Sequence, residues 1–446
     1  MERGFCIMAF PEAPGRVGEF ANLEGQSDPV LGRHGTLPWG RHRPGTIEPT
    51  GPLNDPQLSR KQLQVTVRRD QIEIENLGRL PLRLNGQPAT RCPVHEGDLI
   101  ELGDRVMLRV SHRRPLPPSA SEMVPWGGPD AAGWVGESDV SWHFRERLRF
   151  VSARGVHVLV TGPSGSGKEF VARALHAQSG RGHHALVTRS AATIPESLAD
   201  AELFGNTRGY PNPGMPARPG LIGEADGSTL FLDEFGELPE PVQARLLRVA
   251  DDGEYTRLGE ARARRSDLRI IAATNRDLAS LKHDLRARFK IHVTVPPLED
   301  RLDDIPLLVV HLIRRIVAED EGLQQRLFAE GQLDRGPRVS FRLLRRLLTE
   351  RYTTHVRQLE GLLWSAIAYA RDGVLDQLGP EMQASSLPSQ PSGPVDPGTL
   401  DPVLVQAVLD RHGGHQEPAW RELGLSSRHV LARFVKKHGL RVRQRG

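Results

Sequence analysis

The chain has 446 residues, which predicts two to four domains, and 38% of them are hydrophobic, which is enough for globular cores. Its net charge of +4 favours no class of partner, and its two cysteines, Cys6 and Cys92, exclude a disulfide framework or a cysteine-rich metal site. No apolar run approaches the length of a membrane helix, and the first residues lack the pattern of a signal peptide, so we expect a cytoplasmic protein without a membrane span.

The first third of the chain shows a β pattern. Residues 1–25 have no clear period, so we expect them to be disordered. Within 27–113, four short runs at 63–67, 71–74, 81–84 and 105–110 alternate apolar and polar residues between turn signals, which predicts a small β-sandwich. Residues 114–133 are rich in Pro, Ser and Gly, which is typical of a linker.

The rest of the chain changes character twice. Strands alternate with helices over 135–300, which predicts a parallel α/β sheet, and 301–375 is helical. A second linker is predicted at 385–398, followed by a helical segment at 399–446. Residues 411–446 carry nine Lys or Arg against two Asp or Glu, and this basic end favours nucleic acid over a solvated tail.

A glycine-rich turn follows the apolar run 156–160. Such a turn aims backbone N–H groups at one small volume, and the helix after it adds the positive end of its dipole. The lysine of the turn then reaches the outer phosphates of a nucleoside triphosphate. The residues predicted to bind ATP are Gly162, Pro163, Ser164, Gly165, Ser166, Gly167, Lys168 and Glu169.

A second strand, 228–232, ends in Asp233 and Glu234, about 65 residues after the lysine. Asp233 is suited to hold the Mg²⁺ that bridges the phosphates, and Glu234 to polarise the attacking water. The alternative is a buried strand that ends at an acidic turn. Glu169 stands where phosphate loops usually have the Ser or Thr that touches the metal, so Asp233 should carry more of that contact.

These motifs together resemble one family. Residues 135–375 resemble the AAA+ domain of bacterial enhancer-binding proteins, the activators of sigma-54 RNA polymerase. The matching blocks are Gly162–Glu169, Pro195–Leu198, Glu202–Gly205, Ala225–Gly227, Thr229–Glu234, Leu246–Val249 and Arg269–Leu278.

The resemblance implies further site residues. Asn275 matches the first sensor, which detects the γ-phosphate, and Arg357 matches the second sensor, which closes the helical lid on the nucleotide. Arg288 matches one of two arginine fingers that reach the neighbouring subunit, and Lys282 stands at the other finger position. Fingers that act on a neighbouring subunit imply a homo-oligomeric ring, a hexamer in the family.

Two positions depart from the family. Its polymerase-contacting loop reads Gly-Ala-Phe-Thr-Gly-Ala, whereas residues Gly209–Gly214 here lack both the Phe and the Thr. Arg189 replaces the Asn that, in the family, couples the catalytic glutamate to that loop, and it is a candidate to pair with Glu234 and restrain it. The alternative is a surface arginine that has no role in the site.

The amino-terminal region resembles a forkhead-associated (FHA) domain, which reads phosphothreonine on a partner. Arg41, Ser59 and Arg60 match its phosphate-binding positions and supply charge-assisted hydrogen bonds and a hydroxyl. Gln62 replaces the usual His, and the usual Asn-Gly after the sixth strand is missing. The alternative is a sandwich kept only for protein contact.

The carboxy-terminal segment resembles the Fis-type helix-turn-helix of the same family. Its third helix would present one face to DNA, where Arg428 suits guanine edges and the later basic residues suit phosphate. The predicted DNA-binding residues are Ser427, Arg428, His429, Arg433, Lys436 and Lys437. A small helical oligomerisation hairpin is the alternative.

The sequence therefore predicts a multidomain chain: an FHA-like β-sandwich, an α/β AAA+ domain with a helical lid, and an all-α helix-turn-helix. Its predicted function is ATP- and Mg²⁺-dependent, DNA-bound regulation of transcription through sigma-54 polymerase, controlled by the sandwich. Two alternatives stay open. One is a nucleotide-binding scaffold on DNA that does not remodel polymerase, and the other is a phosphopeptide-controlled ATPase that remodels another protein.

Overall fold

The computed structural model describes residues 1–69, 71–116, 124–276, 288–328, 336–380 and 382, and single residues at 405, 406, 409, 431, 434, 435, 438 and 440. The chain divides into two units, Met1–Leu378 and Gly379–Gly446. The predicted linker 385–398 and most of the predicted helix-turn-helix lie outside the described residues. Within those ranges, none of the helices combines the length and the apolar character that a membrane span requires.

Two antiparallel sheets form the amino-terminal sandwich. The larger has the order β5-β4-β2-β1-β12-β11-β8-β9 and the smaller β10-β7-β6-β3. The strands are β1 (Glu2–Ala9), β2 (Phe20–Asn22), β3 (Val30–Leu31), β4 (Trp39–Arg43), β5 (Thr46–Pro49), β6 (Leu63–Val67), β7 (Ile72–Asn76), β8 (Leu82–Leu84), β9 (Gln87–Ala89), β10 (Arg91–Val94), β11 (Leu99–Leu102) and β12 (Val106–Arg113). A 3₁₀ helix, η1 (Pro14–Arg16), lies between β1 and β2.

One apolar core joins the two sheets. Phe5 and Ile7 of β1 pack in the same cluster as Val65 of β6 and Ile74 of β7, and all four are fully buried. Alternate residues of a strand face the same side, so each sheet contributes one face to this core. The predicted β-sandwich is confirmed at this level, and the structure adds that both of its sheets are antiparallel.

The expectation that residues 1–25 are disordered is wrong. β1 pairs with both β2 and β12 inside the larger sheet, and the run from Gly4 to Met8 is buried throughout. A strand covered on both faces shows an unbroken apolar run in place of period-two alternation, so the alternation test could not find it.

The α/β domain is a five-stranded parallel sheet of order β14-β15-β18-β13-β19. Its strands are β13 (Val158–Thr161), β14 (Leu186–Ser190), β15 (Thr229–Asp233), β18 (Arg269–Thr274) and β19 (Ile291–Thr294). Its helices are α1 (Asp139–Ser152), α2 (Lys168–Ala177), η2 (Ala191–Thr193), η3 (Glu196–Leu198), α3 (Ala199–Phe204), α4 (Gly220–Glu224), η4 (Phe235–Glu237) and α5 (Glu240–Asp252). A small hairpin, β16 (Glu254–Tyr255) with β17 (Arg264–Arg265), follows α5.

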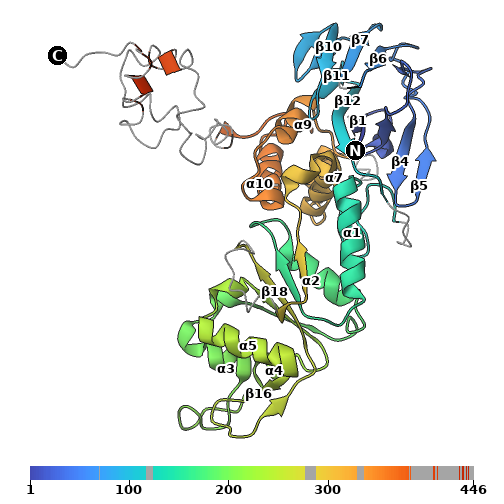
Figure 1. Ribbon diagram of the computed structural model, residues 1–446. Helices are drawn as coiled ribbons and strands as arrows, with labels where there is room; N and C mark the ends of the chain where they lie inside the picture. The colour runs from blue at the N-terminus through green and yellow to red at the C-terminus, as the bar shows by residue number, and fades with distance from the viewer. Residues whose placement is uncertain are drawn as a thin grey trace, which may run out of the picture. The chain divides into compact units, whose positions relative to one another are not determined.

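Helices cover both faces of this sheet, because its strands feed two separate cores. Ile271 and Ala273 of β18 pack with residues of α1 and α2, whereas Ile270 and Ala272 pack with residues of α3, α4 and α5. Figure 1 shows α2 and α5 on opposite sides of β18. The predicted α/β class is confirmed.

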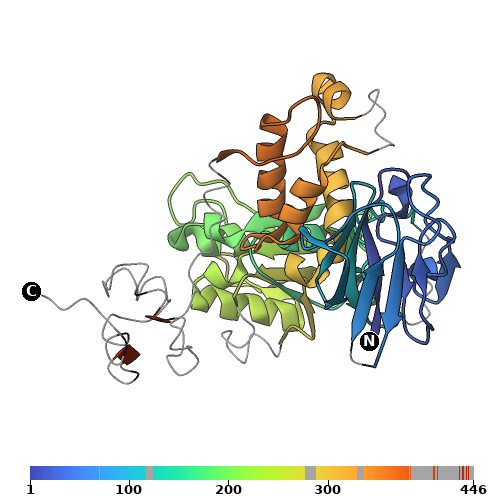
Figure 2. The ribbon, with the colours of Figure 1, turned by 90° about the horizontal axis from the view of Figure 1, so that it is seen from above.

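The helical lid begins at η6 (Leu298–Asp304) and continues through α7 (Ile305–Ile316), α8 (Glu321–Leu327), α9 (Phe341–Leu348) and α10 (His355–Ala368). Figure 2 shows these helices in orange beside the sandwich in blue. Arg345 of α9 forms an ion pair of 2.6 Å with Glu101 of β11, so the lid contacts the sandwich directly.

Part of the predicted linker 114–133 packs against the sandwich. The indole N–H of Trp126 donates to the Val17 carbonyl at 2.9 Å. Arg43 of β4 donates to the Val124 carbonyl at 2.7 Å and forms an ion pair of 3.0 Å with Glu137. These contacts tie the segment before α1 to the sandwich.

Candidate nucleotide-binding site

The phosphate loop connects β13 to α2. Gly165 has φ of 74° and Gly167 has φ of 103°, a region of backbone space that favours glycine. Gly167 is also the N-cap of α2, so the first N–H groups of this ten-residue helix face the loop. The loop therefore leads into the positive end of a helix dipole, and a glycine-rich turn of this kind suits an anion.

Lys168 lies across the mouth of this loop. Its ammonium donates to the carbonyl oxygens of Gly162 at 3.0 Å and Pro163 at 3.1 Å. Burial lowers the pKa of Lys168, while the negative charges of Asp233 and Glu234 oppose that shift. The amine is therefore positioned between the loop and the two carboxylates, where a phosphate chain with its metal would bring it a stronger partner.

The carboxylates lie at the same edge of the sheet. Asp233 ends β15, and its Oδ1 accepts the Glu234 N–H at 2.9 Å. Glu234 has φ of 51°, and its Oε2 accepts a hydrogen bond of 3.4 Å from the hydroxyl of Ser190, which ends β14. Asn275 follows β18, the strand between β13 and β15, so it comes from between the phosphate loop and the acids.

The helical lid also contacts the phosphate loop, at Ser164 and Gly165. Nη1 of Arg357 donates to the hydroxyl of Ser164 at 3.4 Å. A Cβ on Gly165 would lie 2.2 Å from the Thr354 carbonyl oxygen, so the backbone that precedes α10 approaches the loop at this glycine. Nδ1 of His355 accepts the Leu298 N–H at 3.3 Å, which joins α10 to the first turn of the lid. The structure thus brings Arg357 to the loop, as its match to the second sensor implies.

Glu169 is committed along its own helix. Its carboxylate pairs with Arg173 at 2.6 Å, and both side chains are more than half exposed. No three acidic, His or Cys residues among the described residues form a metal cluster. Mg²⁺ commonly takes one or two carboxylates, phosphate oxygens and waters, so Asp233 fits the metal without such a cluster.

Arg189 does not pair with Glu234. Its guanidinium donates to Glu202 at 3.2 Å, so the expectation that it restrains the catalytic glutamate is wrong. Adjacent residues of a strand point to opposite faces, and in β14 it is Ser190 that faces Glu234. Sequence analysis missed Ser190, whose only signal is its place at the end of a strand beside β15.

Arg288 lies against α5. It pairs with Asp251 and donates to the Leu247 carbonyl at 3.4 Å, with its side chain 37% exposed. The second finger position, Lys282, lies outside the described residues. So do the predicted DNA-binding residues Ser427, Arg428, His429, Arg433, Lys436 and Lys437.

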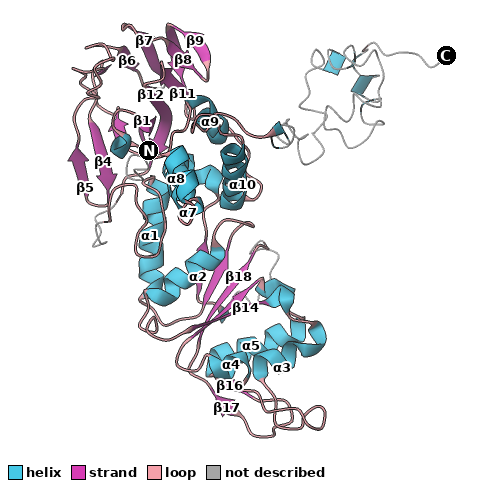
Figure 3. Cartoon of the chain, turned by 180° about the vertical axis from the view of Figure 1, so that it is seen from behind, coloured by secondary structure: helices cyan, strands magenta, loops and turns pink. Residues whose placement is uncertain are grey.

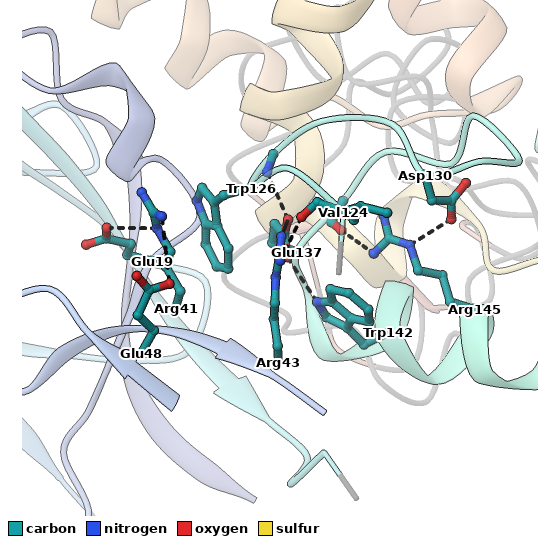
Figure 4. Close-up of polar contacts among 12 residues, drawn as sticks. Glu19, Arg41, Arg43, Glu48, Val124, Trp126, Asp130, Glu137, Trp142 and Arg145 are labelled. Atoms are coloured by element: carbon teal, nitrogen blue, oxygen red, sulfur yellow. Dashed lines mark hydrogen bonds and ion pairs between the residues drawn. The ribbon is translucent and has the colours of Figure 1, made fainter. Parts of the chain in front are cut away.

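In the sandwich, Arg41 already has partners. It lies 3.7 Å from Glu19 and 3.8 Å from Glu48, and its guanidinium is 5.4 Å from the ring centroid of Trp126 (Figure 4). Within the described part of the chain, Arg41 forms no hydrogen bond or ion pair with Ser59 or Arg60, the other two predicted phosphate-binding residues.

Gln62 supports the other predicted phosphate-binding loop. Its buried amide donates to Asn76 Oδ1 at 2.8 Å and to the Leu80 carbonyl at 3.0 Å, and its Oε1 accepts the Ser59 N–H at 3.2 Å. The Ser59 hydroxyl accepts the Arg79 N–H at 3.0 Å. Gln62 therefore braces the loop at the position where the FHA pattern has a His.

The chain is similar to several known proteins. Residues 134–296 match the family model described as Sigma-54 interaction domain. The transcriptional regulatory protein ZraR of Salmonella typhimurium is 33% identical over 314 residues, which cover 68% of each chain. The Nif-specific regulatory protein of Azotobacter vinelandii is 35% identical over 314 residues, which cover 67% of this chain and 58% of that protein. The crystal structure of NtrX from Brucella abortus in complex with ADP aligns with a TM-score of 0.48 and 28% identity over 70% of each chain.

Proposed function

Because the chain belongs to the family of transcriptional regulators that carry a sigma-54 interaction domain, we propose that it is an ATP-dependent regulator of sigma-54 transcription bound to DNA. The observation that carries the proposal is the convergence of Lys168, the Asp233–Glu234 pair and Arg357 at one edge of the parallel sheet. Ligands of α/β sheets bind beyond the carboxyl ends of the strands, and this is that edge.

Each residue has a chemical role at this edge. The N–H groups of the phosphate loop and Lys168 would bind the phosphates of ATP, and Asp233 would hold Mg²⁺, whose charge would offset that of the phosphate oxygens. Glu234 orients and polarises the attacking water, and the Ser190 hydroxyl fixes one of its oxygens. Arg357 brings the lid onto the bound nucleotide, and Asn275 detects the γ-phosphate.

Arg288 acts on the site of a neighbouring subunit in this proposal. To do so, Arg288 must break its ion pair with Asp251. In an assembled ring, the guanidinium would instead contact the phosphoryl group that is being transferred in the neighbouring subunit. The site of a single chain would then be incomplete, and ATP hydrolysis per chain should rise with protein concentration.

ATP hydrolysis measured against protein concentration tests this proposal. Wild-type protein should show a rise in turnover per chain as it assembles. Arg288→Ala should lose most of that rise, whereas Arg91→Ala, which removes an arginine from an exposed ion pair of the sandwich, should keep it. Turnover that is independent of concentration, or equal in the two variants, would refute the trans-acting finger.

The departures at Gly209–Gly214 keep the two other functions open. Open-complex formation by sigma-54 polymerase with ATP supports the activator. ATP turnover without open complexes supports an ATPase that remodels another protein. Tight nucleotide and DNA binding without turnover supports the scaffold. For the activator and the scaffold, DNA binding is assigned to the basic segment 399–446.

A sensor function of the sandwich is a second proposal, and the loop at Ser59 supports it. Ser59 is braced by Gln62, and the side chains of Arg60 and Arg79 beside it are exposed. A phosphothreonine peptide should therefore bind at this loop without displacing Arg41 from its acids. Titration calorimetry should show binding lost in Arg60→Ala and kept in Arg83→Ala, an exposed arginine of β8. Equal affinity in both variants would leave the sandwich as a protein-contact domain.

A further inference from the structure

Two loops of the α/β domain lie side by side, and we call them together the basic tip: residues 207–218 and 256–265. The Thr207 N–H donates to the Leu258 carbonyl at 3.0 Å. The buried Asn206 amide donates to three carbonyl oxygens of the first loop at 2.9, 3.1 and 3.0 Å. Gly259 has φ of 77°, and a Cβ there would lie 2.7 Å from the ring of Tyr210. The loops are therefore in direct contact and share one base.

The tip lies at the end of the α/β domain away from the lid helices, and it includes β17, which pairs with β16 (Figures 1 and 3). The nucleotide site lies at the lid end of the domain, because Thr354 and Arg357 of the lid contact the phosphate loop. The tip therefore does not cover the nucleotide site. A ligand of the tip can therefore be tested separately from ATP.

The tip is strongly cationic. Its two loops contain six arginines and one acidic residue, Glu260. Glu260 is used by Arg264 at 2.8 Å, and Arg218 lies 3.7 Å from Glu202 outside the tip. Three further arginines are exposed and form no ion pair within the described part of the chain: Arg208, Arg262 and Arg265. Glu254 faces Arg265 across the β16–β17 ladder and offsets part of this charge.

The tip also has one exposed aromatic ring. Tyr210 is 43% exposed, and among the described residues of the tip no other large hydrophobic side chain is exposed. A stable protein interface needs a desolvated apolar centre, which one ring does not provide. Arginines around an exposed ring instead match the way proteins hold unpaired nucleic acid, with phosphates on the cations and a base stacked on the aromatic face.

We propose that the basic tip binds the sugar-phosphate backbone of an unpaired DNA strand, with Tyr210 stacked on one base. This goes beyond the ATP-dependent regulation proposed above and does not depend on it. The loop that carries Tyr210 is the one that lacks the family's Phe and Thr, so its different chemistry is accounted for by a different ligand.

The test uses the full chain and a fluorescein-labelled 30-residue oligothymidylate, with binding followed by anisotropy over a series of salt concentrations. The tip variant Arg208→Ala/Arg262→Ala/Arg265→Ala should bind about ten-fold more weakly. Its slope of log affinity against log salt should fall by about 2, because each lost contact to a single strand contributes about 0.7. The control Arg68→Ala/Arg69→Ala/Arg83→Ala removes three exposed arginines of the sandwich and should retain wild-type affinity and slope.

Tyr210 provides a second readout with a conservative rescue. Tyr210→Ala should weaken oligothymidylate binding at least about five-fold, as expected for the loss of one stacked base, and Tyr210→Phe should restore it. Equal affinities of the tip and control variants would overturn the proposal, because the strand would then bind elsewhere. Competition by polyglutamate as strong as that by oligothymidylate would also overturn it, in favour of an acidic protein. ATP turnover measured on the same samples reports whether each variant is folded. If the wild-type protein itself shows no turnover, the proposed ATP-dependent function is refuted, whereas the proposal for the basic tip is still decided by the binding of oligothymidylate.

Discussion

Removal of the Asp303 carboxylate should weaken the junction between the sandwich and the lid. Its Oδ1 accepts from Arg109 and from the Ser111 hydroxyl, each at 2.8 Å, and its Oδ2 lies 3.4 Å from Arg113. The side chain of Asp303 is 8% exposed and that of Arg113 is 4% exposed. Asp303→Ala would leave two arginines in a largely dry junction without their acid, and breaking a buried pair from one side costs about 3–5 kcal/mol.

The pH dependence gives this prediction a second, sharper form. Burial by itself raises the pKa of Asp303, but the charges of Arg109 and Arg113 and the hydrogen bonds from Ser111 and Arg109 bring it below the ordinary value. A carboxyl whose pKa is lowered on folding contributes stability that is complete above the unfolded pKa of about 3.9 and is lost as pH falls through the folded value. The difference between wild type and Asp303→Ala should therefore be constant from pH 8 to pH 5 and shrink only below about pH 4.

Urea unfolding followed by tryptophan fluorescence is the appropriate assay, because Trp126 and Trp142 both lie beside the Arg43–Glu137 pair, which joins the sandwich to the segment before α1. The matched control is Glu24→Ala, which removes the acid of a more exposed pair with Arg3 and should change stability by less than about 1 kcal/mol. A loss in Asp303→Ala no larger than in the control would refute the reasoning. So would a difference that already decays between pH 7 and pH 5.

Four further predictions concern single side chains. Lys168→Ala should abolish retention of a labelled ATP analogue, because the phosphates lose their one lysine; unchanged retention would contradict the site. Gly165→Ala forces a Cβ against the Thr354 carbonyl at positive φ, so it should lower both ATP affinity and the melting temperature, measured by equilibrium binding and calorimetry. Burial is the main cause that lowers the pKa of His42 to about 4, so the unfolded chain gains the proton first and stability should fall by about 3 kcal/mol from pH 6.5 to pH 4, a fall that His42→Gln removes. Burial raises the pKa of the Cys6 thiol, so it should react with a disulfide reagent at pH 8 only after denaturation, and rapid native labelling of a Cys92→Ser variant would show otherwise.

The sequence was sufficient where local chemistry determines geometry. The glycines of the phosphate loop, the strand that ends in Asp233 and the alternation of β6 and β7 each determine their structure within a few residues. Parallel strands place their carboxyl ends at one edge, which is why Lys168 and Asp233 could be assigned to one site from a separation of about 65 residues. Arg357 required the family resemblance, because nothing in its neighbourhood predicts a contact with a loop almost two hundred residues earlier.

The failures have a common physical cause, since each depends on which face of an element is covered. β1 was missed because both its faces are buried, and its run lacks alternation. The prediction pairs Arg189 with Glu234, but side chains alternate along β14, so it is the next residue, Ser190, that contacts Glu234. Nor does the sequence predict the partners of Arg41, which meets Glu19 and Glu48 beside an indole from a segment more than eighty residues later. A sequence pattern identifies the outward residues of a strand, but it does not show what packs on them.

The junction shows how this packing ties the sandwich to the nucleotide site. Asp303 and Asp304 are adjacent in η6, the first turn of the lid. Asp303 forms ion pairs with the arginines of β12. Asp304 accepts hydrogen bonds from the backbone N–H and the hydroxyl of Ser138 and from the hydroxyl of Ser141, at the start of α1. The other end of η6 donates from Leu298 to His355, two residues before Arg357. A single seven-residue segment, η6, therefore joins the sandwich, the first helix of the α/β domain and the lid arginine. A displacement of the sandwich would have to strain these hydrogen bonds or move the lid.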